Sequence, residues 1–110
     1  MFQKNLNIAY LLDFYGDVLS ERKRQVLDDY YNNDLSLAEI AAELSISRQG
    51  VRDLIKKAEE ELKFYESKLG LAQRFREAGE HAKVLHALAK QYELPEVVLS
   101  EIDALESSIH

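Results

Sequence analysis

One stretch of the sequence, residues 36–62, constrains the fold most because it carries two helix starts on either side of a short turn. Ser36 is followed three residues later by Glu39, the spacing of a capping box, in which each side chain bonds the other residue's backbone N–H. Apolar residues then recur at helical spacing until the period breaks at residues 45–47. Ser47 is placed to cap the next helix. The pattern predicts two helices joined by a three-residue turn.

The second helix of this pair has an apolar face and a basic face. Val51, Leu54 and Ile55 have the spacing of core residues. Residues 47–57 contain four basic residues and one acidic residue, although the formal net charge of the chain is -6. In helix-turn-helix proteins, residues near the start of the second helix reach base edges in the major groove. Arginine pairs well with guanine and glutamine with adenine. The predicted contact residues are Arg48, Gln49, Arg52 and Lys56.

The turn departs in one respect from many turns of this kind. Ser45 stands where glycine is frequent, because that position takes a left-handed backbone conformation. Serine adopts this conformation at a modest cost in free energy. The sequence therefore remains compatible with a tight helix-turn-helix.

Composition excludes several other classes of protein. One proline and four glycines among 110 residues leave little room for hairpins and favour an all-α fold. The absence of cysteine removes disulfides, thiolate metal sites and cysteine nucleophiles. No apolar run approaches the ~20 residues of a membrane span, and no secretory leader opens the chain, so we expect a cytoplasmic protein.

The sequence also lacks the common signatures of catalysis and metal binding. It has no phosphate-binding glycine loop, nucleophile elbow or zinc-protease motif. His81 and His86 are five residues apart, so they do not share a helical face closely enough to hold one ion, and His110 is terminal. We therefore expect no enzymatic activity, no cofactor and no metal site.

The remaining pattern predicts a helical bundle followed by a helical extension. A helix is expected over residues 5–19, and a second begins after Ser20 and ends at residues 32–34. The motif's second helix continues to Gly70, and Pro95 suits the first turn of a last helix. The predicted domains are a helix-turn-helix domain, residues 1–70, and a C-terminal extension, residues 71–110.

Three long helices carry apolar stripes that step by four and three residues, as in coiled coils. The stripes are Val51, Ile55, Ala58, Leu62, Tyr65 and Leu69; then Leu71, Phe75, Ala78, Ala82, Leu85, Ala89 and Tyr92; then Val98, Ile102, Leu105 and Ile109. They either pack within one chain or form the interface of a homodimer. We favour the dimer, because the C-terminal helices offer more apolar surface than a small N-terminal core can cover.

Charged and aromatic clusters outside the motif have simpler explanations. We expect residues 22–24, a short basic run, to form a solvated helical face, with a phosphate contact as the alternative. The acidic run at residues 59–61 is also expected to be solvated. The six tyrosines fit core or interface burial better than base stacking. They are Tyr10, Tyr15, Tyr30, Tyr31, Tyr65 and Tyr92.

The charge distribution bears on the identity of the partner, because DNA affinity depends largely on neutralising phosphates. Residues 58–110 hold eleven acidic and six basic residues, whereas residues 36–57 hold three acidic and four basic residues. The excess negative charge therefore lies away from the predicted contact helix. Either the C-terminal half points away from DNA, or DNA is not the partner.

Residues 19–62 resemble region 4 of bacterial sigma factors, and the whole chain resembles the YlxM family of small bacterial proteins. The segments that carry the second resemblance are NIAYLLDFYGDVLS, the block from DDYYNND to EEEL, and FYESKLG. The sigma resemblance implies a DNA face made of Ser47, Arg48, Gln49, Arg52 and Lys56. No segment resembles the sigma regions that engage polymerase, so a complete sigma factor is not expected.

The YlxM resemblance implies an all-helical protein whose gene lies beside those of the signal recognition particle. Three functions follow from these observations. The first is a DNA-binding regulator that acts as a dimer. The second is an accessory factor that binds signal recognition particle RNA or its GTPase. The third is a helical protein in which the motif serves only as a packing unit.

Overall fold

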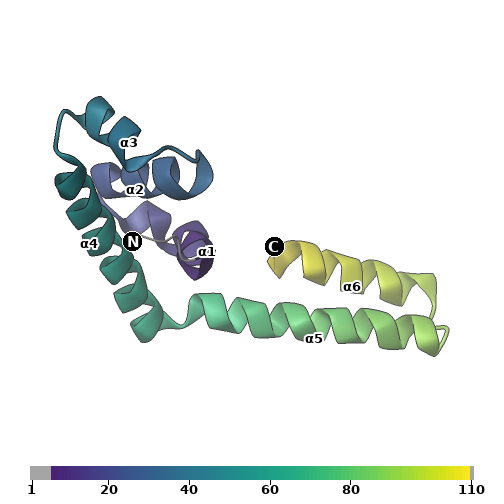
Figure 1. The fold of residues 1–110 in the computed structure, drawn as a ribbon. Coiled ribbons are helices and arrows are strands. Elements are labelled where there is room, and N and C mark those ends of the chain that lie inside the picture. Colours follow the sequence, from purple (N-terminus) through teal and green to yellow (C-terminus); the bar gives the residue numbers. More distant parts are fainter. Residues whose placement is uncertain (1–5, 110) are drawn as a thin grey trace. The chain divides into compact units, whose positions relative to one another are not determined.

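The computed structural model describes residues 6–109, which contain six α-helices and no β-strand (Figure 1). The predicted all-α fold is confirmed. The helices are α1 (Leu6–Tyr15), α2 (Glu21–Leu27), α3 (Leu37–Leu44), α4 (Arg48–Leu69), α5 (Leu71–Gln91) and α6 (Glu96–Ile109). Two compact units share them: an N-terminal unit up to Gly70 with α1 to α4, and a C-terminal unit from Leu71 with α5 and α6.

The N-terminal unit begins with an apolar helix that ends earlier than predicted. The expected start at residue 5 lies outside the described residues. α1 stops at Tyr15, and a 3₁₀ turn, η1 (Gly16–Val18), follows where the sequence predicted more α-helix. This tighter turn places Leu19 in the core and leaves Val18 exposed. The change in winding therefore selects which of two adjacent apolar residues is buried.

A buried carboxylate fixes the connection from α2 to α3. Ser20 caps α2, as predicted, by accepting a bond from the backbone N–H of Lys23. A π-helical turn, η2 (Asp28–Asn32), then ends the helix close to the predicted position. Within it Asp29 is only 6% exposed, and its side chain accepts hydrogen bonds from the amides of Gln25 and Asn33. These bonds satisfy a polar group that would otherwise be costly to bury.

The apolar stripe of α4 forms the centre of the N-terminal core. α4 packs against α1, α2 and α3. The four fully buried stripe residues are Val51, Ile55, Ala58 and Leu62. This part of the stripe is therefore covered by helices of its own chain. Of the two alternatives, packing within one chain and a homodimer interface, the first holds here. Beyond it Tyr65 is half-buried and Leu69 is exposed.

Three glutamates of α4 tie this helix to the N-terminal helices. The bonds join Tyr31 Oη to Glu59 Oε1 (2.5 Å), Lys23 Nζ to Glu61 Oε2 (2.6 Å) and Tyr15 Oη to Glu66 Oε1 (2.5 Å). The prediction of a solvated acidic segment at residues 59–61 is thus wrong for its first and last members. Their carboxylates are half-buried and accept charge-assisted hydrogen bonds.

The C-terminal unit is an antiparallel hairpin of α5 and α6 (Figure 1). A short turn reverses the chain, with Glu93 at a φ of 51°. The carbonyl of Pro95 accepts bonds from the N–H groups of Val98 and Leu99, so this proline immediately precedes α6, one position before the first turn in which it was predicted. The buried positions of α5 include Gly79, Ala82 and Ala89, whose small size allows close approach of two helices.

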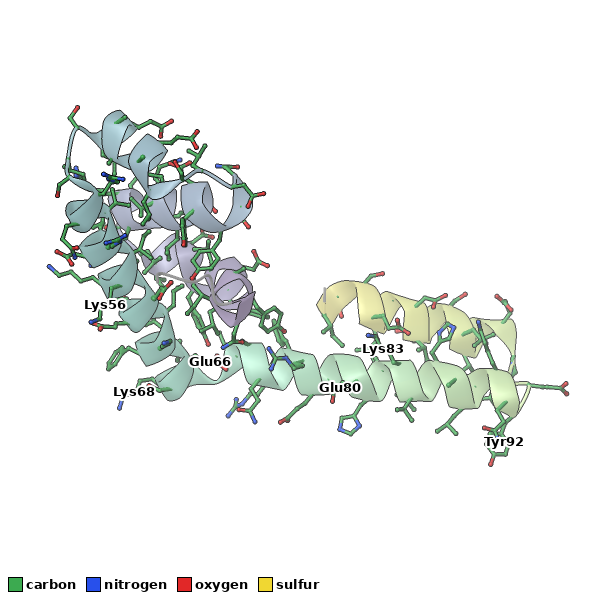
Figure 2. The ribbon with its side chains drawn as sticks, in the orientation of Figure 1. Lys56, Glu66, Lys68, Glu80, Lys83 and Tyr92 are labelled. Carbon is green, nitrogen blue, oxygen red and sulfur yellow. The ribbon has the colours of Figure 1, made fainter. Side chains whose placement is uncertain are left out.

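The predicted stripe of α5 is partly wrong. Ala82 and Ala89 are buried, but Leu85 is 47% exposed and Tyr92 is 68% exposed, and Figure 2 shows Tyr92 projecting beside the turn. The buried face is rotated to include Gly79, because small residues rather than large ones occupy the helix contact. The large apolar residues that remain outside on α5 include Val84, Leu85 and Leu88. On α6, Leu105 is likewise exposed.

Candidate nucleic-acid interface

The candidate interface begins with α3, whose capping box forms as predicted. Ser36 Oγ accepts a hydrogen bond from the backbone N–H of Glu39 (3.1 Å), and Glu39 Oε1 accepts one from the N–H of Ser36 (3.2 Å). The helix buries Ile40 and Ala41 against the unit's core. The start of this short helix is therefore fixed by local bonds, and its middle is held by packing.

The turn between α3 and α4 also has the predicted geometry. Ser45 has a φ of 56° and a ψ of 43°, a left-handed conformation. Its N–H and that of Ile46 donate to carbonyls at the end of α3, which satisfies groups that a helix end leaves unpaired. Ser47 then caps α4 by accepting a bond from the N–H of Gly50 (2.9 Å). These contacts fix the crossing of the two helices.

We expect Ser45→Gly to stabilise the N-terminal unit by about 0.5–1 kcal/mol, because glycine adopts the left-handed conformation without the steric cost that serine bears. Urea denaturation measures the change. Ser67→Gly is the control of opposite sign, since Ser67 is helical in the last turn of α4 and glycine is a poorer helix former than serine. A loss of stability in Ser45→Gly would contradict the left-handed turn.

All five predicted contact residues are exposed at the start of α4. They are Ser47, Arg48, Gln49, Arg52 and Lys56. Arg48, Arg52 and Lys56 are four residues apart in turn and therefore form one row along the helix. Lys56 projects from α4 away from the helices packed against it (Figure 2). The structure thus gathers the predicted side chains on one accessible surface, beside the buried stripe.

One predicted contact residue, Gln49, has an internal partner that was not predicted from the sequence. Gln49 Nε2 donates a hydrogen bond to Asp53 Oδ1 (3.0 Å), one turn later. Asp53 is exposed on the same surface and is an acceptor that can bond the amino group of cytosine. The spacing of four between an amide and a carboxylate is the signal that would have identified this pair.

The basic run at residues 22–24 is largely engaged within the N-terminal unit. Lys23 pairs with Glu61, as described above, and Arg24 Nη1 lies 2.7 Å from Asp17 Oδ1. Arg22 is exposed. Two of the three cations therefore have carboxylate partners within this unit, whereas the basic side chains at the start of α4 are exposed.

A further cluster, in the C-terminal unit, was not predicted. His86 of α5 lies beside Asp103 and Glu106 of α6. His81 takes no part in this cluster, and the partners of His86 come from the neighbouring helix. Only the hairpin brings the three side chains together.

A model of the UPF0122 family, described as "Putative helix-turn-helix protein, YlxM / p13 like", matches residues 2–103. The chain belongs to this family. The UPF0122 protein of Caldanaerobacter subterraneus subsp. tengcongensis is 50% identical over 72 residues, 66% of this chain and 62% of the relative. The match to the Bacillus mycoides protein is 39% identical over 107 residues, 96% of this chain and 97% of the relative. The match to the Halalkalibacterium halodurans protein is 41% identical over 109 residues, 96% of this chain and the whole relative.

Family membership confirms the helix-turn-helix interpretation. The chain spans less than two thirds of the first relative's length but nearly all of the other two. The family description names a structural motif and no catalytic activity. Within residues 6–109, no helix combines the length and hydropathy that crossing a bilayer requires.

Proposed function

We propose that this protein binds duplex DNA through the start of α4 and regulates transcription. The observation that carries the proposal is the exposed row Arg48, Arg52 and Lys56 on a helix whose start and crossing angle are fixed by caps and a left-handed turn. Helix-turn-helix proteins use this arrangement to place a recognition helix in the major groove. Such a regulator acts in the cytoplasm, where bacterial DNA lies.

Each side chain of the row suits a particular contact. Arg48 and Arg52 have the donor geometry for guanine, whereas Lys56, farther along the helix, suits a phosphate. Gln49 keeps its carbonyl oxygen available while its amide donates to Asp53. The proposal therefore assigns base contacts to the first two turns of α4 and backbone contacts to the third.

The formal net charge of -6 does not describe the surface proposed to meet DNA. Glu59, Glu61 and Glu66 accept hydrogen bonds from the N-terminal helices. Residues 48–57 carry four basic residues and one acidic residue, all exposed. The surface offered to phosphates is therefore basic even though the formal net charge is -6.

We also propose that the active form is a homodimer assembled through the C-terminal units. Support comes from the exposed apolar side chains of α5, among them Val84, Leu85 and Leu88. A monomeric protein rarely leaves a large apolar patch in contact with water. Dimerisation would present two recognition helices to two half-sites, with a spacing set by the interface.

We expect Arg52→Ala to weaken specific DNA binding about 5- to 150-fold, the loss that accompanies removal of one good guanine contact of ~1–3 kcal/mol. The measurement is fluorescence anisotropy at two salt concentrations. The probes are a duplex from upstream of the protein's own gene and a scrambled duplex. Arg74→Ala is the matched control, because Arg74 is an exposed arginine of α5 outside the proposed interface.

The comparison of probes separates specific from non-specific binding. Arg52→Ala should reduce the preference for the upstream duplex, while Arg74→Ala should leave that preference intact. Circular dichroism of both variants checks that helix content is unchanged. Equal affinity of wild type and Arg52→Ala for the upstream duplex would remove Arg52 from the interface.

The C-terminal unit favours a second candidate, an accessory factor that binds signal recognition particle RNA or its GTPase. Residues 71–110 hold seven acidic and four basic residues, and their exposed apolar side chains suit a protein partner better than duplex DNA. RNA binding would differ from DNA binding, because the major groove of A-form RNA does not admit a helix. Adding the particle RNA and the GTPase to the titration tests this candidate.

A further inference from the structure

The C-terminal unit brings one imidazole and two carboxylates together across the helical hairpin. His86 Nδ1 lies 3.3 Å from Asp103 Oδ1 and 3.4 Å from Glu106 Oε1. The two acidic residues are three positions apart and therefore adjacent on one face of α6. One ligand atom from each of the three residues lies within 4.8 Å of the others.

The imidazole nitrogen at the centre of this cluster has no hydrogen bond. His86 Nδ1 is inaccessible to solvent, and neither carboxylate oxygen meets it with hydrogen-bond geometry. A buried polar atom without a partner is unusual in a folded protein and calls for an explanation. Two carboxylates side by side also repel each other unless a positive charge lies between them.

The two separations from His86 Nδ1 match those of ligands around a small metal ion. Bonds of ~2.0–2.1 Å from zinc to nitrogen and oxygen, in tetrahedral geometry, put neighbouring ligand atoms about 3.3–3.4 Å apart. Both measured distances from His86 Nδ1 fall in this range. Because the side chain of Asp103 is 65% exposed, an ion can enter from solvent and keep water as its fourth ligand.

We propose that His86, Asp103 and Glu106 form a binding site for a divalent transition-metal ion, for which Zn²⁺ is the best match. Imidazole favours zinc and its neighbours over Mg²⁺ and Ca²⁺, which prefer oxygen ligands alone. Two carboxylates neutralise the charge of the ion. The bound metal links α5 to α6 and stabilises the hairpin whose exposed face we propose for dimerisation.

A metal-free explanation of the same geometry is a protonated His86 that forms ion pairs with both carboxylates. The two explanations differ in what the protein binds. An ion pair needs no added cation, and it predicts that zinc changes neither the heat of mixing nor the thermal stability. The metal site predicts one ion per chain and a higher melting temperature with zinc, because ligand binding to the folded state stabilises it.

The test uses the untagged full chain, stripped with a chelator and titrated with Zn²⁺ by calorimetry and with Co²⁺ by visible absorption. We expect one ion per chain and at least about a tenfold weaker affinity in His86→Gln, since even losing an outer-shell partner costs that much. His81→Gln is the matched control, because His81 is exposed and lies on the same helix. Glu106→Gln should lower affinity in the same direction.

Asp103→Asn keeps the test decisive if His86→Gln fails to fold, since Asp103 is largely exposed and contributes little to packing. Its affinity for zinc should fall while its circular dichroism stays that of wild type. A wild-type protein that takes up no zinc, or an equal loss of binding in His81→Gln and His86→Gln, would overturn the proposal. Neither result would affect the DNA titration.

Discussion

Leu62→Ala is expected to lower the free energy of unfolding of the N-terminal unit by about 3–5 kcal/mol. Leu62 is 0% exposed and belongs to the stripe of α4 that packs against the N-terminal helices. Alanine would remove three carbons from a site that is enclosed on all sides and leave a cavity. A loss of this size is a large fraction of the stability of a small domain.

Leu69→Ala provides a matched control for this substitution. The chemical change is the same, and Leu69 lies in the same helix, but its side chain is 51% exposed. We expect a change of at most about 0.5 kcal/mol, as for most surface substitutions. Urea denaturation followed by tyrosine fluorescence reports mainly on the N-terminal unit, which holds five of the six tyrosines. Equal losses in the two variants would contradict the packing of α4.

The features predicted correctly from the sequence depend on residues close together in the chain. The capping box of α3, the left-handed Ser45 and the cap at Ser47 each involve partners within four positions. The buried stripe of α4 repeats over several turns, so its apolar period is unambiguous. These local signals were sufficient to locate the helix-turn-helix and to identify which side of its second helix is exposed.

The features that the sequence did not predict depend on partners distant in the chain. Tyr31 and Glu59 are 28 positions apart, and Lys23 and Glu61 are 38, so no local pattern links them. An acidic run looks the same in a sequence whether its carboxylates are solvated or bonded to a neighbouring helix. The cluster around His86 was missed for the same reason.

The error on α5 has a different physical cause. The prediction assumed that apolar residues stepping by four and three, whether large or small, mark one buried face. In the hairpin the helices meet through Gly79, Ala82 and Ala89, and the exposed Leu85 lies outside the contact. Periodicity alone does not separate two overlapping stripes that differ by one residue, and only the position of the partner helix decides between them.

Tyr15→Phe is expected to destabilise the N-terminal unit by about 1.5–3 kcal/mol, the range for a hydrogen bond to a charged group. Tyr15 is 3% exposed, and its hydroxyl donates to Glu66 Oε1 at 2.5 Å. Its ring also lies 6.0 Å from that of Tyr65, measured between centroids. Phenylalanine preserves this ring contact, so the substitution removes only the hydroxyl and its bonds. Urea denaturation gives the loss, with Tyr92→Phe as the control because Tyr92 is 68% exposed.

A double-mutant cycle with Glu66→Gln isolates the interaction between the two side chains. If the bond holds the last turns of α4 against α1, the double variant should lose less stability than the sum of the single losses. Few buried apolar contacts hold α4 beyond Leu62, because the end of its apolar stripe is exposed. The bond between Tyr15 and Glu66 is therefore expected to contribute much of the attachment there. Additive losses would show that the hydroxyl and the carboxylate act independently, and packing alone would then have to hold those turns in place.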